Sequence, residues 1–342
     1  MVNFKLMRIL GIETSCDDTS MGVVENGKLI SMVRTSSEEF HVRYGGVVPE
    51  IAARKHLELF PFVLKEVLRR GKLKLKDIEG ISVTFGPGLV GSLLVGTELA
   101  KTLSFFLKIP FVGVNHLEGH IYSIFFEYKM DFPFLTLLIS GGHTEIILVQ
   151  GHLKYKIIGT TLDDACGEII DKIGRKLGFP YPAGKELDKL ALKGNPDRYN
   201  FTLPRFKNRK RRFSFSFSGM KTQALNIINS KNFVLEDLVS SLFKGISEEL
   251  LDRIKLASKE TGITNISVVG GVSASKFLRE RFRREKELNF YFPSPELSTD
   301  NGGMIALVGE EYLKRGFYSS FELDAVSHLK LGENLYLKSD RI

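Results

Sequence analysis

Two histidines four positions apart, His116 and His120, have the side-chain type and the spacing of a metal-ligand pair. Residues at i and i+4 lie on one face of an α-helix, so both imidazoles would point the same way. A helix that offers two imidazole nitrogens in this way can hold Zn²⁺ or a related ion. Such pairs also occur by chance on surface helices, so the spacing alone leaves a metal site and a plain surface helix as equal alternatives.

A metal ion held by two histidines needs further ligands, and carboxylate oxygens suit both Zn²⁺ and Fe²⁺. The best candidate is Asp300, which lies just before an apolar helix expected over 304–313. Its alternative role is that of N-cap to this helix. Asp17 and Asp18, in a polar turn near the N-terminus, are further acidic candidates. The donor set does not choose between Fe²⁺ and Zn²⁺.

Glu118, between the two histidines, raises the alternative of a metal-dependent peptidase. In zinc peptidases the glutamate directly follows the first histidine. Here it stands two positions on, which at about 100° per residue places it on a different helix face. The spacing therefore disfavours peptide hydrolysis.

The composition is that of an ordinary globular chain with room for two domains. It has 342 residues, of which 43% are hydrophobic, and a formal net charge of +8. The charge is consistent with a polyanionic partner. Cys16 and Cys166 do not suggest a disulfide framework, so a cytoplasmic location is expected. We expect no apolar run long enough to span a membrane, and therefore no membrane partner.

One order of elements occurs twice along the chain. Strands expected over 8–13, 21–24 and 29–33 are followed by a helix over 49–70, a strand over 81–85, a helix over 91–107 and a strand over 109–114. From residue 135 the order returns, with strands over 135–139, 145–149 and 155–158, helices over 163–177 and 235–261, a strand over 266–269, a helix over 274–283 and a strand over 289–292.

This duplication predicts an α/β fold of two actin-like lobes, the architecture of actin, Hsp70 and sugar kinases, with a cleft between the lobes. We expect the first lobe over 1–132 and the second over 133–342, with an insertion over about 179–220. The last helix, about 302–316, is expected to pack back towards the first lobe. In each lobe a small polar turn joins the first two strands, and such turns can direct backbone N–H groups at phosphate.

The insertion contains a basic run followed by alternating Phe and Ser. Its cations are Arg205, Lys207, Arg209, Lys210, Arg211 and Arg212. A solvated loop and a nucleic-acid contact are the two alternatives, and the neighbouring aromatic residues favour the second.

An acidic segment near residue 163 is expected to begin a helix with acids in its first turn. Asp164, Glu168 and Asp171 would then share one face, either to hold ribose hydroxyls or as a solvated stripe. A Gly-Gly turn at Gly270 opens a later helix, where a backbone turn can pack against an adenine.

Taken together, the motifs resemble those of the tRNA adenosine threonylcarbamoyltransferase (TsaD) family, the bacterial relatives of a KEOPS subunit. The resemblance runs in order from about Arg8 to Gly316. Its motifs are GIETSCDDTS, YGGVVPEIAARKH, GPGLVGSLLVG, NHLEGH, LLISGGHTEI, DDACGEIIDKIGRKLG, FSFSGMKT, GGVSAS and TDNGGMIA.

The resemblance implies an actin-like two-lobe fold and an acyltransferase. It implies transfer of threonylcarbamoyl from threonylcarbamoyl-adenylate to N6 of the adenosine beside the anticodon in tRNAs reading ANN codons. It also implies metal ligation by His116, His120 and Asp300, and a catalytic role for Asp17. The implied substrate contacts are Leu138, Ile139, Ser140, Gly141, Gly142, Asp171, Gly184, Asp188 and Ser275, the last at a position where the family usually has Asn.

The implied partners are tRNA, a shorter actin-like paralogue of the TsaB type, a small P-loop ATPase of the TsaE type and the synthase that makes the adenylate. Three rivals remain at this stage: a metallopeptidase, a nucleotide-regulated chaperone of the Hsp70 type, and a kinase or O-carbamoyltransferase on the same fold.

Overall fold

The computed structural model describes residues 7–204, 208, 211–334 and 336–339. The chain divides into two compact units, Met1–Tyr128 with Thr299–Ile342, and Lys129–Ser298. The sequence-based boundary at residue 132 lies close to the first division. Residues 299–342, which we expected to belong to the second lobe, are part of the first unit because their main helix packs on the first sheet.

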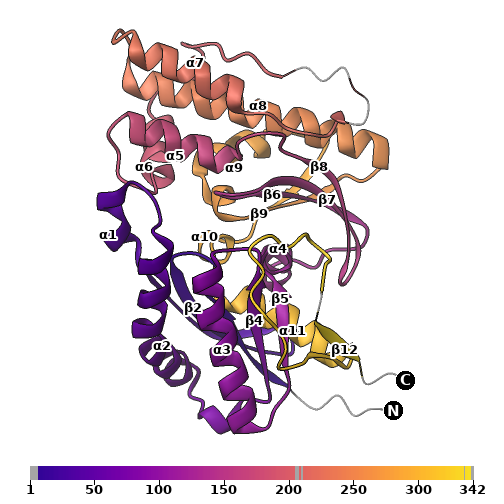
Figure 1. Cartoon of the computed structure of the whole chain (residues 1–342). Coiled ribbons are helices and arrows are strands. Elements are labelled where there is room, and N and C mark those ends of the chain that lie inside the picture. Colours follow the sequence, from indigo (N-terminus) through magenta and orange to yellow (C-terminus); the bar gives the residue numbers. More distant parts are fainter. Residues whose placement is uncertain (1–6, 205–207, 209–210, 335, 340–342) are drawn as a thin grey trace. The chain divides into compact units, whose positions relative to one another are not determined.

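The first unit is built on a five-stranded sheet in the order β3-β2-β1-β4-β5 (Figure 1). The first three strands form an antiparallel meander, and β4 and β5 continue it in parallel. The strands are β1 (Arg8–Glu13), β2 (Asp18–Glu25), β3 (Lys28–Ser36), β4 (Gly80–Gly86) and β5 (Phe111–Asn115). β1 and β4 are almost entirely buried, as expected of strands covered on both faces.

The second unit repeats this sheet with the order β10-β9-β6-β7-β8. Again three strands form an antiparallel meander and two add in parallel. The strands are β6 (Phe134–Ile139), β7 (Thr144–Gly151), β8 (Lys154–Thr160), β9 (Asn265–Val269) and β10 (Asn289–Tyr291). The twice-repeated meander that the sequence predicts is therefore present in both units.

One face of the first sheet is covered by two helices, α2 (Pro49–Gly71) against β2 and β3, and α3 (Val90–Leu107) against β4. Among the described residues, α3 is long and apolar enough to cross a membrane by length and composition. The expectation that no run reaches this length is therefore wrong. In this fold α3 packs beside β4 and α2, where Ala100 and Leu103 join the core of the first unit, whereas Phe105 and Phe106 are exposed.

The opposite face is covered by α11 (Gly302–Lys314), which packs on β1, β2 and β4. Glycines allow the two backbones to meet. A Cβ on Gly11 would lie 2.0 Å from the carbonyl oxygen of Gly302, and one on Gly22 would lie 2.4 Å from the amide of Gly303. Such distances exclude any larger side chain, so the start of α11 is held directly on β1 and β2.

The helices of the second unit pack around one apolar core that includes β6, β9 and the long α8. They are α5 (Cys166–Lys176), α6 (Gly184–Ala191), α7 (Ser218–Asn229), α8 (Leu235–Thr261), α9 (Lys276–Arg283) and α10 (Pro295–Ser298), with the 3₁₀ turn η5 (Gly271–Ala274). The remaining described elements belong to the first unit: α1 (Glu38–His41), η1 (Val42–Tyr44), η2 (Leu75–Asp77), α4 (His116–Tyr122), η3 (Ser123–Phe126), β11 (Phe317–Ser319) and β12 (Leu337–Ser339).

Candidate metal centre and substrate site

His116 is the first residue of α4, the short helix that follows β5, and His120 lies one turn further along it. The side chain of Asn115 accepts a hydrogen bond from the amide of Leu117 at 2.9 Å and so caps the helix. This cap ends the strand and starts the helix between two adjacent residues. His116 and His120 are both buried, with ring centroids 4.7 Å apart. The alternative of a surface helix with unrelated histidines is thereby excluded.

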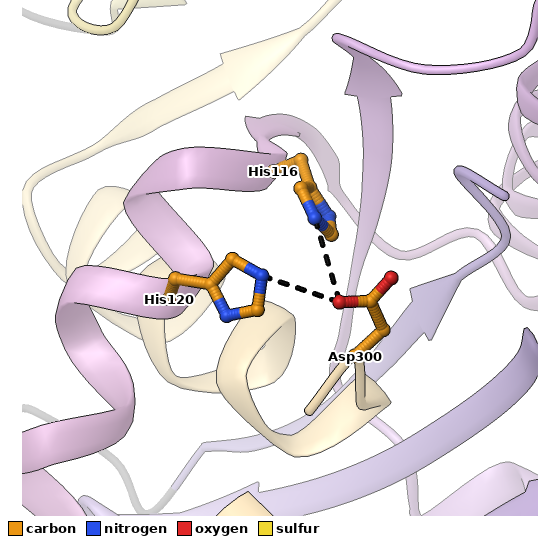
Figure 2. A group of neighbouring side chains, drawn as sticks. All are labelled: His116, His120 and Asp300. Carbon is orange, nitrogen blue, oxygen red and sulfur yellow. Dashed lines mark ion pairs between the residues drawn. The ribbon is translucent and has the colours of Figure 1, made fainter. Parts of the chain in front are cut away.

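Asp300 reaches the two histidines from the start of α11 (Figure 2). Its Oδ1 lies 3.2 Å from Nε2 of His120 and 3.6 Å from Nε2 of His116. One ligand atom from each residue lies within 4.8 Å of the other two. The N-cap of α11 is Asn301, whose Oδ1 accepts from the amide of Met304 at 2.8 Å. Asp300 is therefore free of the capping role that the sequence left open.

A fourth group, Glu13 at the end of β1, holds His116 from the other side of its ring. Its Oε2 lies 2.9 Å from Nδ1 of His116 and accepts a hydrogen bond from Oγ1 of Thr84 at 2.6 Å. Its Oε1 accepts from the amide of Ser15 at 2.6 Å. A carboxylate on Nδ1 places the proton there and leaves Nε2 as the free ligand atom towards Asp300.

The donor set fits a divalent cation. Within the described part of the chain, Nε2 of His120 is buried without a hydrogen-bond partner of good geometry, and with Nε2 of His116 it faces one oxygen of Asp300. Buried imidazoles rarely stay unsatisfied unless a further group binds there. Two histidines and an aspartate match Zn²⁺ and Fe²⁺ equally well.

Charge balance supports the same conclusion. Burial alone would lower the pKa of His116, but Glu13 and Asp300 raise it to about 9. Burial also opposes ionisation of Asp300, yet the charge of His116 and the hydrogen bond of His120 hold its pKa below the usual range. The two carboxylates therefore favour a positive charge between them, as a site for a cation requires.

Asp17, in the polar turn between β1 and β2, and Asp18, the first residue of β2, lie next to this centre. Asp18 lies 3.8 Å from Nε of Arg34, whose guanidinium also donates to Oγ1 of Thr299, the neighbour of Asp300. Burial, with the charges of Asp300 and Asp17, raises the pKa of Asp18 to about 7. Asp17 is half-buried in the same turn.

The backbone of this turn is fixed by residues that our sequence analysis did not single out. The amide and hydroxyl of Ser37 donate to the carbonyl of Asp17 at 3.1 and 2.9 Å. His56 on α2 is fully buried, with Nε2 2.9 Å from the carbonyl of Cys16 and Nδ1 2.7 Å from Oγ1 of Thr19. Burial lowers the pKa of His56, which favours the neutral ring that can donate at one nitrogen and accept at the other.

Glu118 is directed away from the histidine pair. Both of its carboxylate oxygens lie 3.1 Å from the hydroxyl of Tyr312 on α11. Burial raises the pKa of Glu118 to about 7. This carboxyl is engaged with another helix, which agrees with the sequence argument against a peptidase.

In the second unit, the expected substrate residues 138–142 lie at the end of β6 and in the turn that follows it. The side chains of Leu138 and Ile139 are buried in β6, whereas Gly141 and Gly142 lie in the turn that follows it. A Cβ on either glycine would meet no atom of the described chain within 4 Å. The turn after β6 is therefore open on the side where a ligand could approach its backbone.

The neighbouring elements pack tightly around the base of this turn. A Cβ on Gly167, at the start of α5, would lie 2.6 Å from the carbonyl oxygen of Ser140. One on Gly270, which has a φ of +91°, would lie 2.5 Å from the carbonyl of Ile139. The glycines thus bring α5 and the end of β9 beside the turn after β6.

Two expected contact residues hold helix N-termini instead of standing free. Asp171 accepts from the amide of Ala183 at 2.8 Å, one residue before Gly184 begins α6. Asp188 accepts from the amides of Lys276 and Phe277 at 2.9 and 3.1 Å, and the hydroxyl of Ser275 contacts it as well. The serine at the family's usual asparagine position is thus bound to Asp188.

The acidic segment near residue 163 differs from the sequence prediction. The helix α5 begins at Cys166, and Asp163 instead accepts from the amide of Phe217 at 2.8 Å, at the start of α7. Asp164 lies outside α5 and forms ion pairs with Lys172 and Lys221. The expected stripe of three acids on one helix face is therefore wrong: Glu168 and Asp171 lie in α5, whereas contacts of residues 163–164 with the start of α7 keep Asp164 outside the helix.

The basic run is described only in part. Arg205, Lys207, Arg209 and Lys210 lie outside the described residues. Arg211 is exposed, and Arg212 forms an ion pair with Glu260 on α8.

The duplicated sheets and the His₂Asp centre define a class: a two-lobe actin-like α/β protein with a metal-type site in its first unit. Solved structures agree on the fold. HypF of T. kodakarensis matches with a TM-score of 0.63 at 16% identity, covering 90% of this chain and 48% of that one. Component A of (R)-2-hydroxyglutaryl-CoA dehydratase from Acidaminococcus fermentans matches with a TM-score of 0.57 at 14% identity, covering 89% and 98%.

Sequence relatives specify the family within this class. The family model of tRNA N6-adenosine threonylcarbamoyltransferase matches residues 28–307. Proteins of that name from Kosmotoga olearia and Clostridium kluyveri are 49% and 43% identical to this chain, covering 95% and 96% of it and 99% of each relative. The chain belongs to the tRNA N6-adenosine threonylcarbamoyltransferase (TsaD) family.

Proposed function

We propose that this protein is an acyltransferase that moves threonylcarbamoyl from threonylcarbamoyl-adenylate to N6 of the adenosine 3′ of the anticodon in tRNAs reading ANN codons. The observation that carries the proposal is the convergence of His116, His120 and Asp300 in a chain of this family. In the reaction, the adenosine amine attacks the carbamoyl carbon and loses a proton. The bond from that carbon to phosphate oxygen breaks, and AMP leaves with the electron pair.

The first unit would hold the metal ion and accept the proton. His116, His120 and Asp300 would be the ligands, with Fe²⁺ and Zn²⁺ as the two candidate ions. When bound, the ion supplies Lewis acidity and a fixed positive charge. Glu13 keeps His116 in the tautomer with Nε2 free. Asp17, held through its carbonyl by Ser37, is our candidate acceptor for the amine proton.

The second unit would bind the adenylate. The open turn after β6 offers backbone N–H groups to a phosphate, and its glycines leave room for close approach. Asp188 and Ser275 would contact the donor only by giving up part of their present hydrogen bonding. The proposed set is Leu138, Ile139, Ser140, Gly141, Gly142, Asp171, Gly184, Asp188 and Ser275.

We propose tRNA, an actin-like TsaB-type paralogue, a small P-loop ATPase of the TsaE type and the adenylate synthase as partners, acting in the cytoplasm. Of the proposed tRNA-binding cations, the described ones are Arg211 and Arg212. Neutralising both should weaken tRNA binding and flatten its salt dependence, whereas Lys193→Gln, at an exposed position elsewhere in the second unit, should change neither.

The test is reconstitution with tRNA, threonine, bicarbonate, ATP, the synthase and the two partner proteins, followed by mass analysis of the nucleosides. Wild-type protein should yield threonylcarbamoyladenosine. Asp17→Asn should lower the rate by roughly 10²–10⁴-fold, the usual contribution of a general base. Absence of product from wild-type protein, even with preformed adenylate, would contradict the proposed function.

A further inference from the structure

The two residues between Leu117 and His120 both face α11. Glu118 is 2% exposed, and the hydroxyl of Tyr312 lies 3.1 Å from each of its carboxylate oxygens. Gly119 packs on the same helix nearer its start, where a Cβ would come within 2.7 Å of Cδ1 of Ile305. Gly119 therefore lies close to the apolar side chains of α11, and the polar contact of Glu118 lies further along that helix.

This contact joins the two helices that carry the metal-type residues. α4 bears His116 and His120, and α11 begins two residues after Asp300 and holds Tyr312 in its last turn. The start of α11 is held on β1 and β2 by glycine contacts and by a 2.9 Å hydrogen bond from the amide of Gly302 to Oγ of Ser20. The Glu118–Tyr312 contact therefore anchors α4 to a helix whose own position is fixed.

We infer that Glu118 and Tyr312 are positioning residues that set the spacing between the histidine pair and Asp300. The inference rests on the proposed role of these three residues as metal ligands. Ligand groups must stay within a fraction of an ångström of their productive geometry to bind tightly. A buried polar pair is suited to this task because either partner left alone loses its hydrogen bond without gaining water.

The competing explanation is that the pair only stabilises the fold. The two explanations differ in what they predict for metal affinity measured on folded protein. A fold-stabilising pair would lower the melting temperature of the variants and leave the affinity of the folded fraction unchanged. A positioning pair changes the affinity itself, and both residues act through the same contact, so their effects should not add.

The experiment is Zn²⁺ binding to metal-free protein by competition with a chromophoric chelator, at a temperature where every variant is folded by circular dichroism. Glu118→Ala and Tyr312→Phe should each weaken Zn²⁺ binding by about 10–100-fold, as loss of supporting residues around metal ligands usually does. The double variant should be no weaker than the worse single one. Glu118→Gln, whose amide oxygen can still accept from Tyr312, should restore affinity to within a few-fold of wild type.

The matched control is Val63→Ala, a fully buried residue of α2 in the core of the same unit. It should lower the melting temperature and leave Zn²⁺ affinity unchanged. If Glu118→Ala does not fold, Tyr312→Phe, which removes a single hydroxyl, carries the test alone. Unchanged affinity in Tyr312→Phe, with tight binding by wild type, would overturn the inference and leave the proposed function standing. Failure of wild type to bind Zn²⁺ or Fe²⁺ would overturn both.

Discussion

The turns that follow the first strand of each unit occupy equivalent places in two similar sheets, yet they are built in opposite ways. In the first unit, Glu13 and Thr14 are buried, and a Cβ on Gly96 would lie 2.3 Å from Oγ1 of Thr14. In the second unit, Gly141 and Gly142 are backed by open space within the described chain. In the first unit, α3 packs against the residue that begins the turn. In the second unit, no described residue covers the two glycines of the turn.

Two buried glutamates beside these turns show the same contrast. Glu13 has three hydrogen-bonding neighbours, and the charge of His116 lowers its pKa although burial opposes this. For Glu145 on β7, burial raises the pKa to about 7, and its Oε2 has no partner among the described residues. The two copies of the same sheet thus carry different groups: an ionised carboxylate paired with a histidine in the first unit, and a buried carboxyl with a raised pKa beside an open turn in the second.

The largest effect is expected from removing Asp300, the proposed ligand that precedes α11. Asp300→Ala should abolish stoichiometric binding of Fe²⁺ or Zn²⁺, because the two imidazoles alone leave the ion without a carboxylate. Elemental analysis of purified protein measures this directly. Asp324→Ala, at an exposed aspartate of the same unit, is the control and should keep its metal. Full metal content in Asp300→Ala would contradict the proposal that Asp300 is a metal ligand.

The two turns should respond in opposite ways to added side chains. Gly142→Val should leave the melting temperature nearly unchanged, because its side chain enters open space. It should raise KM for threonylcarbamoyl-adenylate by roughly 10–100-fold, the equivalent of one or two hydrogen bonds to a charged group. Steady-state transfer with preformed adenylate gives KM.

The matched change in the first unit is Gly96→Ala. Here the added methyl meets Thr14, so unfolding should become easier by about 1–3 kcal/mol in a denaturant titration. A stability loss in Gly142→Val comparable to that of Gly96→Ala would show that the second turn is packed and not open.

A further change tests whether the Glu13 carboxylate acts by accepting a hydrogen bond from His116 or only by filling space beside it. Glu13→Gln keeps the volume but allows an amide N–H to face Nδ1 of His116, which would move the proton to Nε2. Metal affinity should fall by about 10–100-fold. Thr84→Val removes one hydrogen bond to Glu13 and leaves the carboxylate, so its effect on chelator-competition affinity should be smaller. Equal affinities in wild type and Glu13→Gln would contradict the tautomer argument.

The smallest effect concerns Glu145. Its folded pKa of about 7 lies above the ordinary value, so the native chain binds the proton more tightly and loses stability as pH rises from about 5 to 7. At pH 8 this amounts to about 1–3 kcal/mol. Glu145→Gln should remove that loss, and its melting temperature relative to wild type should be higher at pH 8 than at pH 5. If the melting temperatures of Glu145→Gln and wild type differ by the same amount at pH 5 and pH 8, burial does not disfavour the ionised form of Glu145.

Much of the fold follows from local patterns in the sequence. The helix expected over 235–261 is observed as α8 with the same bounds, and both meanders lie where alternating and apolar runs predict them. The helix expected to begin at Asp163 starts at Cys166 instead, because Asp163 binds the amide of Phe217 at the start of α7. Local propensity could not anticipate that partner, since it depends on how the insertion folds back.

The spacing of His116 and His120 was set by the sequence itself, because a helical turn brings i and i+4 together whatever surrounds it. The residues that hold His116 and the neighbouring Glu118 in place were decided only by the tertiary structure. Glu13 lies 103 positions before His116, and Tyr312 lies 194 positions after Glu118. The strand order of the first sheet and the glycine contacts that hold α11 on it bring these partners together. Local sequence patterns do not reveal contacts between residues so far apart in the chain.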